Sequence, residues 1–493
     1  MRTLGRSLRD ARRTATVVAA ALAGLTGLAA PGTARAAALT EVTFPARSAA
    51  LADTWLPGYA GPPRARVLLP DGYDPARQYP LLVLLAGLGN NYRFWSQPGL
   101  GQIAKTAAGF DGIVVMPEGA SGWYADWWNG GRRGDPSWES YLLDDVIPEV
   151  LQRYRIRPER RWHALAGVSM GGLGTAYLGG RLPGFFGSIA VISGLVDGHL
   201  IAGQGAAQSL IAQGAAGAPI DPEAVMGPPD GFYSLGHDPV RLAANLAHTR
   251  VFMATGDGRP SSDGEPNPNN LVPDLPFEAV LIRPASDHYA AALTAAGVDL
   301  TYQVQEGIHD WANFRRELRD AIAWDMFAPA EEAPSAWVND TVATHGELWG
   351  FRYRFDAPPD RIVRFRRTGS RLAVSTAGAA VTVTTPSGCV RRVPTPGGFD
   401  LPARACTRPV VAVRPRVLAA GRTVRVRVTV TPVRAGTVVR AGRRSARTDA
   451  AGIAFLDLCV PGARGAAVRA SVPGFPAAGV TVRGRGRAAA ACR

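Results

Sequence analysis

Short runs of apolar residues alternate with helix-like stretches between residues 65 and 325. The runs are almost continuously apolar, as expected for strands of a parallel sheet that helices cover on both faces. This rhythm predicts an α/β fold with a mostly parallel sheet, whose active site lies at the carboxyl ends of the strands. The expected strands are residues 66–69, 81–86, 112–116, 163–168, 188–192, 250–255 and 300–304.

The pattern changes beyond residues 328–335, where the sequence APAEEAPS indicates a linker. Residues 381–384 and 424–430 alternate apolar and polar side chains, which is typical of half-exposed strands. Glycine and proline interrupt the tail at short intervals and favour antiparallel units of the sandwich type. We therefore expect an α/β domain at 37–330, a β module at 331–408 and a basic β-sandwich-like module at 409–493.

The first residues have the order of a secretory signal peptide. Five arginines precede the apolar run 16–30, and the small-residue site Ala34-Arg35-Ala36 follows it. The run has about 15 residues, fewer than the roughly 20 that a spanning helix needs. We expect cleavage after Ala36 and a secreted, extracellular protein, free or associated with the cell wall. The pair Arg12-Arg13 leaves general and twin-arginine export both open.

All four cysteines lie in the last quarter of the chain. An even number in an exported protein indicates two disulfides, and their order favours Cys389 with Cys406 and Cys459 with Cys492. No Cys-x-x-Cys pair exists, so neither a zinc site nor a cysteine nucleophile is expected. We expect no metal and no cofactor.

The net charge of +14 is divided unevenly along the chain. Residues 37–330 contain 21 basic and 30 acidic side chains, whereas residues 331–493 contain 27 basic and 9 acidic ones. A basic region on an exported protein suits an anionic cell-wall polymer or a membrane surface as partner. Nucleic acid is disfavoured, because no aromatic residues for base stacking are interleaved with the arginines.

A candidate nucleophile lies in Gly167-Val168-Ser169-Met170-Gly171. The motif follows an expected strand and opens an expected helix at 172–178, which is the setting of a nucleophile elbow. The tight turn needs glycines beside it, and it raises the Ser169 hydroxyl above the sheet.

A serine needs a base, which in this arrangement comes from a loop after the last strand. His309, in Gly307-Ile308-His309-Asp310-Trp311, follows the strand expected at 300–304. The acid that orients it is expected between Ser169 and His309, and two candidates remain open. Asp257 follows the strand expected at 250–255, and Glu278 lies in a more apolar setting further on.

Two loops complete the candidate site. The glycine-rich loop 86–91 follows an expected strand, so the backbone N–H groups of Leu88 and Met170 are expected to form the oxyanion hole. Trp123, Tyr124 and Trp127 lie in an aromatic loop after the strand at 112–116, and we expect them to line the substrate site.

These motifs together resemble the putative-esterase family of α/β-hydrolases that includes the secreted mycolyltransferases of the antigen 85 type. The resemblance covers about residues 40 to 328. It rests on the segments Leu84-Leu85-Ala86-Gly87-Leu88, Gly167-Val168-Ser169-Met170-Gly171-Gly172, Ala254-Thr255-Gly256-Asp257-Gly258, Phe277-Glu278 and Gly307-Ile308-His309-Asp310-Trp311.

The resemblance implies a triad of Ser169, His309 and Glu278, with Asp257 as the alternative acid, and it implies that Trp311 flanks the acceptor site. The mycolyltransferases use an acidic residue and an arginine on trehalose, where this chain has Ala86 and Gly89. Trehalose specificity is therefore not expected.

The sequence thus predicts a secreted serine esterase or acyltransferase that acts on an acyl ester through an acyl-enzyme intermediate. A cell-envelope binding or adhesion protein with a degenerate esterase fold is the alternative. A serine peptidase is a third, which the sequence favours less because no local signature indicates a peptide-binding site.

Overall fold

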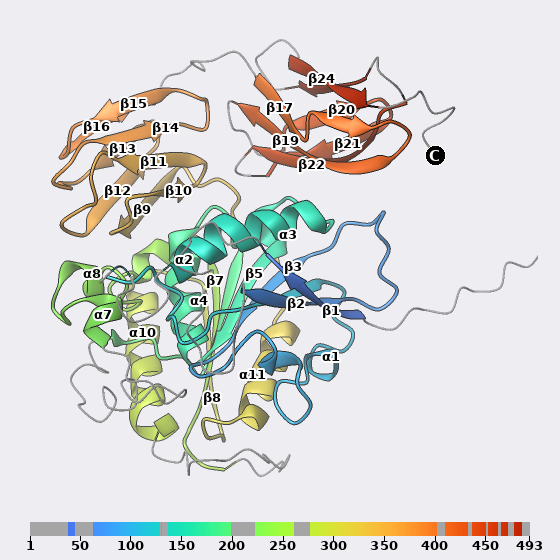
Figure 1. Cartoon of the computed structure of the whole chain (residues 1–493). Coiled ribbons are helices and arrows are strands. Elements are labelled where there is room, and N and C mark those ends of the chain that lie inside the picture. The colour runs from blue at the N-terminus through green and yellow to red at the C-terminus, as the bar shows by residue number, and fades with distance from the viewer. Residues whose placement is uncertain are drawn as a thin grey trace, which may run out of the picture. The chain divides into compact units, whose positions relative to one another are not determined.

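The computed structural model describes residues 38–44, 63–128, 130, 137–198, 222–260, 277–401, 410–431, 436–449, 452–461, 465–471 and 478–485 (Figure 1). The signal peptide expected at 1–36 lies outside these residues, as do Cys406, Cys492 and residue 408, where we divide the tail. Within the described part of the chain, no helix is both long and apolar enough to cross a membrane.

An eight-stranded sheet forms the centre of the first part of the chain (Figure 1). Its order is β1-β2-β4-β3-β5-β6-β7-β8, in which β1, β2 and β4 pair antiparallel and every other neighbouring pair is parallel. The strands are β1 (Ala38–Thr43), β2 (Arg64–Leu69), β3 (Leu81–Leu85), β4 (Ile113–Pro117), β5 (His163–Val168), β6 (Ser188–Ile192), β7 (Arg250–Gly256) and β8 (Leu300–Gln305).

Helices cover both faces of this sheet, which is why β3 to β6 are buried along their whole length. One apolar core contains Val150, Tyr177 and Tyr289, and the other contains Ile103 and Phe314. The helices are α1 (Ile103–Thr106), α2 (Trp138–Ser140), α3 (Ile147–Arg153), α4 (Met170–Arg181), α7 (Pro222–Met226), α8 (Phe232–Leu235), α10 (Arg283–Ala295) and α11 (Trp311–Ala323).

Two antiparallel sheets form residues 336–400 and enclose a core of aromatic and aliphatic side chains. We call this segment the first β region. Its sheets are ordered β10-β11-β14-β15 and β16-β13-β12-β9. The strands are β9 (Ala336–Thr341), β10 (His345–Leu348), β11 (Phe351–Phe355), β12 (Val363–Thr368), β13 (Arg371–Val374), β14 (Val381–Thr384), β15 (Val390–Val393) and β16 (Gly397–Asp400).

The second β region, residues 410–485, has a three-stranded sheet β17-β19-β22 and a five-stranded sheet β18-β24-β23-β20-β21. Valines, alanines and leucines from both sheets form its core. The strands are β17 (Val410–Arg414), β18 (Val417–Ala419), β19 (Thr423–Thr431), β20 (Val438–Ala441), β21 (Arg444–Arg447), β22 (Ile453–Cys459), β23 (Ala466–Ser471) and β24 (Ala478–Arg485).

The predicted fold class, a mostly parallel sheet followed by an all-β region, is confirmed. Each of the seven expected strands of the first sheet is present within two residues of its expected bounds. The sequence prediction missed β1, because this edge strand is largely exposed and does not have the apolar character of the central strands.

Candidate active site

Ser169 occupies the tight turn between β5 and α4. Its backbone has φ 57° and ψ −118°, a strained combination for a residue with a side chain. The Ser169 N–H donates to Ile192 O at 3.0 Å, so the turn is tied to the carboxyl end of β6. The elbow predicted from the sequence is therefore present in the backbone.

Glycines on both sides of Ser169 are required by close approach of the backbone. A Cβ on Gly167 would lie 2.3 Å from Gly171 O, and a Cβ on Gly171 would lie 2.7 Å from Ala86 O. Any side chain at either position would push α4 away from β3 or β5. This close backbone packing explains why the motif has glycine at both positions.

His309 and Glu278 are in direct contact. Nδ1 of His309 lies 2.7 Å from Oε2 of Glu278, whose side chain is fully buried. The rings of Phe277 and Phe314 pack edge-on against the imidazole, with centroids 4.8 and 4.9 Å from its own. This packing and the carboxylate fix the orientation of the ring and leave Nε2 as the atom for proton transfer.

The other carboxylate oxygen of Glu278 is held by three donors. Oε1 accepts hydrogen bonds from Thr255 Oγ1 and Gly256 N, both at 2.7 Å, and from Ser193 Oγ at 2.8 Å. Thr255 and Gly256 end β7, and Ser193 follows β6. Residues at the carboxyl ends of β6 and β7 therefore position Glu278, which lies further along the chain.

A second buried carboxylate lies behind this group. Oε2 of Glu317 is 3.1 Å from Ser193 Oγ, and Asn313 Nδ2 donates to its Oε1 at 2.9 Å. Burial, and then the negative charge of Glu278, raise the pKa of Glu317 well above its ordinary value. Both causes favour the protonated form of Glu317. The sequence prediction missed both Glu317 and Ser193.

Asp257, the alternative acid, lies in a turn. Its Oδ1 accepts from the backbone N–H of Arg259 at 2.8 Å and of Gly307 at 3.4 Å. Among the described residues, no hydrogen bond joins Asp257 to His309. The contact with the imidazole is made by Glu278.

The loop after β3 lies directly against Ser169. A Cβ on Gly87 would be 3.3 Å from the Ser169 Cβ. Leu88 is the next residue along the chain. Met170 begins α4, and its N–H has no acceptor within the helix. The backbone thus brings the loop that contains Leu88 and the first residue of α4 close to the candidate nucleophile.

Tyr124 holds this loop in place. Its hydroxyl accepts from Ala86 N at 2.9 Å and donates to Ala86 O at 3.1 Å. Its own loop is fixed by buried Glu118, whose carboxylate accepts from the N–H groups of Gly119 and Ala120. Burial raises the pKa of Glu118 to about 7. Glu118, which follows β4, was not found from the sequence.

The other aromatic residues expected to line the substrate site are largely buried. Trp123 is 6% exposed, and Trp127 is 8% exposed and donates from Nε1 to Gly122 O. Trp311, the first residue of α11, packs edge-on against Trp95 with ring centroids 5.1 Å apart. These contacts give the residues packing roles, and their contact with substrate stays a prediction.

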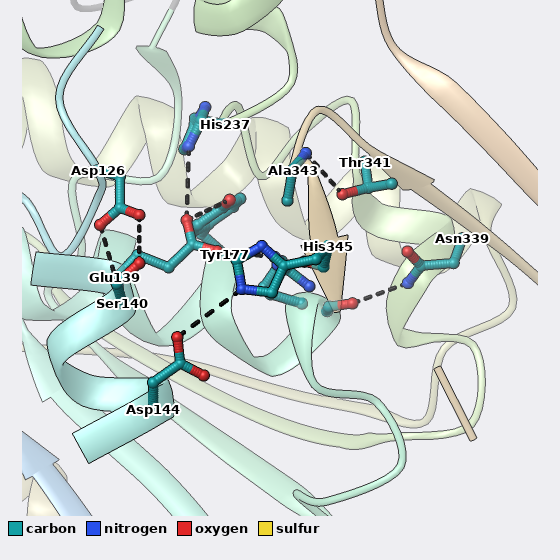
Figure 2. Close-up of polar contacts among 12 residues, drawn as sticks. Asp126, Glu139, Ser140, Asp144, Tyr177, His237, Asn339, Thr341, Ala343 and His345 are labelled. Carbon is teal, nitrogen blue, oxygen red and sulfur yellow. Dashed lines mark hydrogen bonds and ion pairs between the residues drawn. The ribbon is translucent and has the colours of Figure 1, made fainter. Parts of the chain in front are cut away.

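Figure 2 shows a separate polar cluster around Glu139. Buried Glu139 accepts from Tyr177 Oη at 2.8 Å and from Arg181 Nε at 2.7 Å, both on α4. Burial acts to raise the pKa of Glu139, but Arg181 and His237 outweigh it and lower the pKa to about 2. Arg181 Nη2 also donates to the backbone oxygen of His345, on β10, at 2.6 Å.

A cavity of about 900 Å³ adjoins this cluster and is lined by residues that include Tyr177 and Arg181. None of Ser169, Glu278 and His309 lines it. Because Arg181 ends the helix that Met170 begins, the cavity lies at the other end of α4 from the candidate nucleophile.

In chemical terms, the candidate site contains a serine in a strained elbow, an imidazole oriented by a buried carboxylate, and backbone donors beside the serine. This set serves acyl transfer by nucleophilic catalysis. Within the described residues, no group of three or more His, Cys, Asp or Glu side chains is arranged to hold a metal ion.

A family model described as "Putative esterase" matches residues 59–324. The chain is similar to Esterase Rv1288 of Mycobacterium tuberculosis (strain ATCC 25618 / H37Rv), with 35% identity over 134 residues, 27% of this chain and 29% of that protein. It is also similar to the endo-1,4-beta-xylanase/feruloyl esterase of Xylanibacter ruminicola, with 30% identity over 140 residues, 26% of this chain and 19% of that protein. The chain thus matches less than a third of the length of these curated relatives.

Solved structures with a similar chain path include a ferulic acid esterase, with a TM-score of 0.42 and 18% identity, covering 59% of this chain and 98% of that one. Another is MPT51 of Mycobacterium tuberculosis, with a TM-score of 0.46 and 19% identity, covering 60% of this chain and 99% of that one.

Proposed function

Since the chain belongs to the putative esterase family, we propose that it is a carboxylic ester hydrolase that works through an acyl-enzyme intermediate on Ser169. The hydrogen bond of 2.7 Å between His309 and fully buried Glu278 is the observation that carries this proposal. It supplies an oriented base in a fold where the serine already occupies an elbow.

The reaction has two halves. In the first, Nε2 of His309 takes the proton of the Ser169 hydroxyl, and Oγ attacks the ester carbonyl carbon. The backbone N–H groups of Leu88 and Met170 stabilise the oxyanion, and His309 returns the proton to the departing alkoxide. In the second half, His309 activates water or an alcohol, which releases the acyl group and restores Ser169.

We further propose that the enzyme is exported by the signal peptide expected at 1–36, and that its tail carries the two expected disulfides. Domain limits near 330 and 408 belong to the same proposal. The basic tail then contacts an anionic cell-wall polymer or a membrane surface, which the net charge of residues 331–493 supports.

Activity on an ester panel tests the proposed reaction. The purified protein and its Ser169→Ala variant are assayed on p-nitrophenyl esters of increasing chain length and on methyl ferulate, each with and without a sugar acceptor. We expect wild-type turnover of at least one ester and a loss of at least 10³-fold in the variant. Full activity of Ser169→Ala would refute the mechanism.

The same panel separates hydrolysis from transfer. An acyl-sugar product that grows with acceptor concentration would assign an acyltransferase, and free acid alone would assign an esterase. A protein that turns over no ester, but still binds cell walls, would favour the envelope-binding alternative.

A further inference from the structure

The two β regions differ in how many acidic residues accompany their arginines. Residues 336–400 contain nine arginines and five acidic residues, and the ion pairs there include Arg361–Asp360, Arg371–Asp400 and Arg392–Asp356, at 2.7, 3.4 and 2.5 Å. The second β region, residues 410–485, contains fourteen arginines and two acidic residues. Most of the positive charge in the second region therefore has no acid of its own region to pair with.

Both acids of the second region lie outside the strands of the five-stranded sheet. Asp457 lies on β22, in the other sheet, and forms an ion pair with Arg155. Asp449 lies in the turn before β22 and accepts from Ile453 N at 2.8 Å. The five strands β18, β24, β23, β20 and β21 themselves contain no acidic residue.

The register of this sheet places arginines side by side on its exposed face. Arg440 on β20 is directly opposite Arg469 on β23. Their strand neighbours, such as Val439 and Val468, are fully buried in the core, so the arginines point outward. We call the exposed arginines Arg440, Arg447, Arg469, Arg483 and Arg485 the arginine face.

Like charges directly opposite each other on neighbouring strands destabilise a sheet. Strand spacing brings Arg440 and Arg469 to about 5 Å apart at the backbone, with no acid on the sheet between them. An anion that lies over the pair would relieve this repulsion, most of all at low salt. The register therefore points to an external anionic partner.

The side chains between the arginines are small. On the same exposed face lie Ser445, Ala467, Ser471, Gly479 and Thr481. They leave the sheet surface open, so that a chain-like partner can approach the guanidinium groups. The hydroxyls add hydrogen-bond donors and acceptors of the kind that sugar rings use.

We propose that the arginine face binds an anionic polysaccharide, whose repeated carboxylates or phosphates pair with successive arginines. The proposal rests on the tail contact suggested above, and it names one face and one partner; it does not depend on the ester chemistry. No aromatic residue lies on the five strands to stack nucleic-acid bases. Val417 is the one large exposed apolar side chain on them, too little for membrane insertion.

Binding of the full-length protein to fluorescently labelled polygalacturonate tests this face. Fluorescence anisotropy gives Kd for wild type, for the triple variant Arg440→Gln, Arg469→Gln and Arg483→Gln, and for the control Arg361→Gln, Arg371→Gln and Arg392→Gln. Both variants lose three positive charges, but the control arginines are already paired with acids. Circular dichroism establishes that all three proteins are folded.

We expect about tenfold weaker binding for the arginine-face variant and less than twofold for the control. Wild-type binding should weaken on raising the salt concentration more steeply than that of the arginine-face variant, and methyl-esterified polymer should not bind. Equal weakening in both variants would overturn the assignment to this face but leave the general tail contact standing. Stronger binding to phosphatidylglycerol vesicles or to single-stranded DNA, lost in the arginine-face variant, would overturn the choice of partner.

Discussion

At the scale of single residues, Ser193 connects two buried carboxyl groups. It has the positive φ of 39°, and its hydroxyl lies between Glu278 and Glu317. A hydroxyl has one proton, so it donates to one carboxyl group and accepts from the other. When Glu317 is protonated, it donates to Ser193 and Ser193 donates to Glu278, whose other carboxyl oxygen contacts His309.

The protonation of Glu317 makes a prediction about stability. Its pKa is raised in the folded protein, so the folded state holds a proton that the unfolded chain releases above about pH 4.5. Stability therefore falls as pH rises above that value, and Glu317→Gln removes the effect. We expect the variant to gain up to about 1.4 kcal/mol relative to wild type per pH unit between pH 5 and the folded pKa. Urea unfolding at pH 5 to 8 measures this, and a constant difference would contradict it.

The choice of acid makes a second prediction. Glu278→Gln keeps the shape of the side chain but cannot balance the imidazolium, so we expect kcat/KM for p-nitrophenyl butyrate to fall by about 10³-fold. Asp257→Asn changes only a turn and should cost less than threefold. A larger loss for Asp257→Asn than for Glu278→Gln would reverse the assignment.

Sequence alone leads to Ser169 and His309, because each follows an expected strand at a place where the fold needs a polar residue. It leaves the acid open, because Glu278 comes 22 residues after Gly256 and meets it only through tertiary contacts. Ser193, Glu118 and Glu317 are missed for the same reason. Their burial depends on neighbours from other strands and helices, although Ser193 and Glu118 do follow strands directly.

At the scale of elements, the loop after β3 is held in part by a phenol from another loop. Tyr124 satisfies both backbone groups of Ala86, and it belongs to the loop after β4. Parallel strands bring these two loops to the same edge of the sheet. The aromatic run that the sequence assigns to substrate thus also supports the oxyanion loop.

Removing this phenol should affect turnover. Tyr124→Phe leaves Ala86 N and O without their partner, and we expect kcat to fall about tenfold with KM within twofold, because the oxyanion donor acts in the transition state. Tyr177→Phe is the matched control, since it removes a buried hydroxyl bonded to Glu139 at the other end of α4. Steady-state kinetics measures both, and equal losses in kcat would contradict the positional role of Tyr124.

Element positions are predicted well where burial decides them. The central strands are apolar on both faces, so their sequence pattern is unambiguous. The strand β1 is missed because most of its side chains are exposed at the edge of the sheet and need not be apolar. In the β regions, β14 and β19 are found from strict alternation, whereas shorter strands such as β18 carry too few residues for a pattern.

At the scale of the whole molecule, the hydrolase part of the sequence is acidic and the tail is basic. The proposed functions are correspondingly separable: the triad needs none of the tail arginines, and the arginine face needs none of the triad. Binding to a polymer raises the local concentration of an enzyme next to esters carried on that polymer.

This separation predicts a difference between soluble and attached substrates. The variant with Arg440, Arg469 and Arg483 changed to Gln should retain wild-type kcat/KM on soluble p-nitrophenyl esters. On acyl esters carried by polygalacturonate, we expect about tenfold lower activity at low salt, and no difference at 0.5 M salt. Paired progress curves measure this. Equal activity of the variant and the wild type on the polymer at low salt would show that the arginine face does not contribute to activity on attached esters.

Covalent labelling of the serine tests the central claim most directly. Wild-type protein, Ser169→Ala and His309→Ala are treated with a fluorophosphonate, and the intact proteins and their peptides are weighed by mass spectrometry. We predict one adduct on wild type, located at Ser169, no adduct on Ser169→Ala, and labelling at least 100-fold slower on His309→Ala. An unlabelled wild-type protein, or an adduct on another residue that persists in Ser169→Ala, would contradict the account.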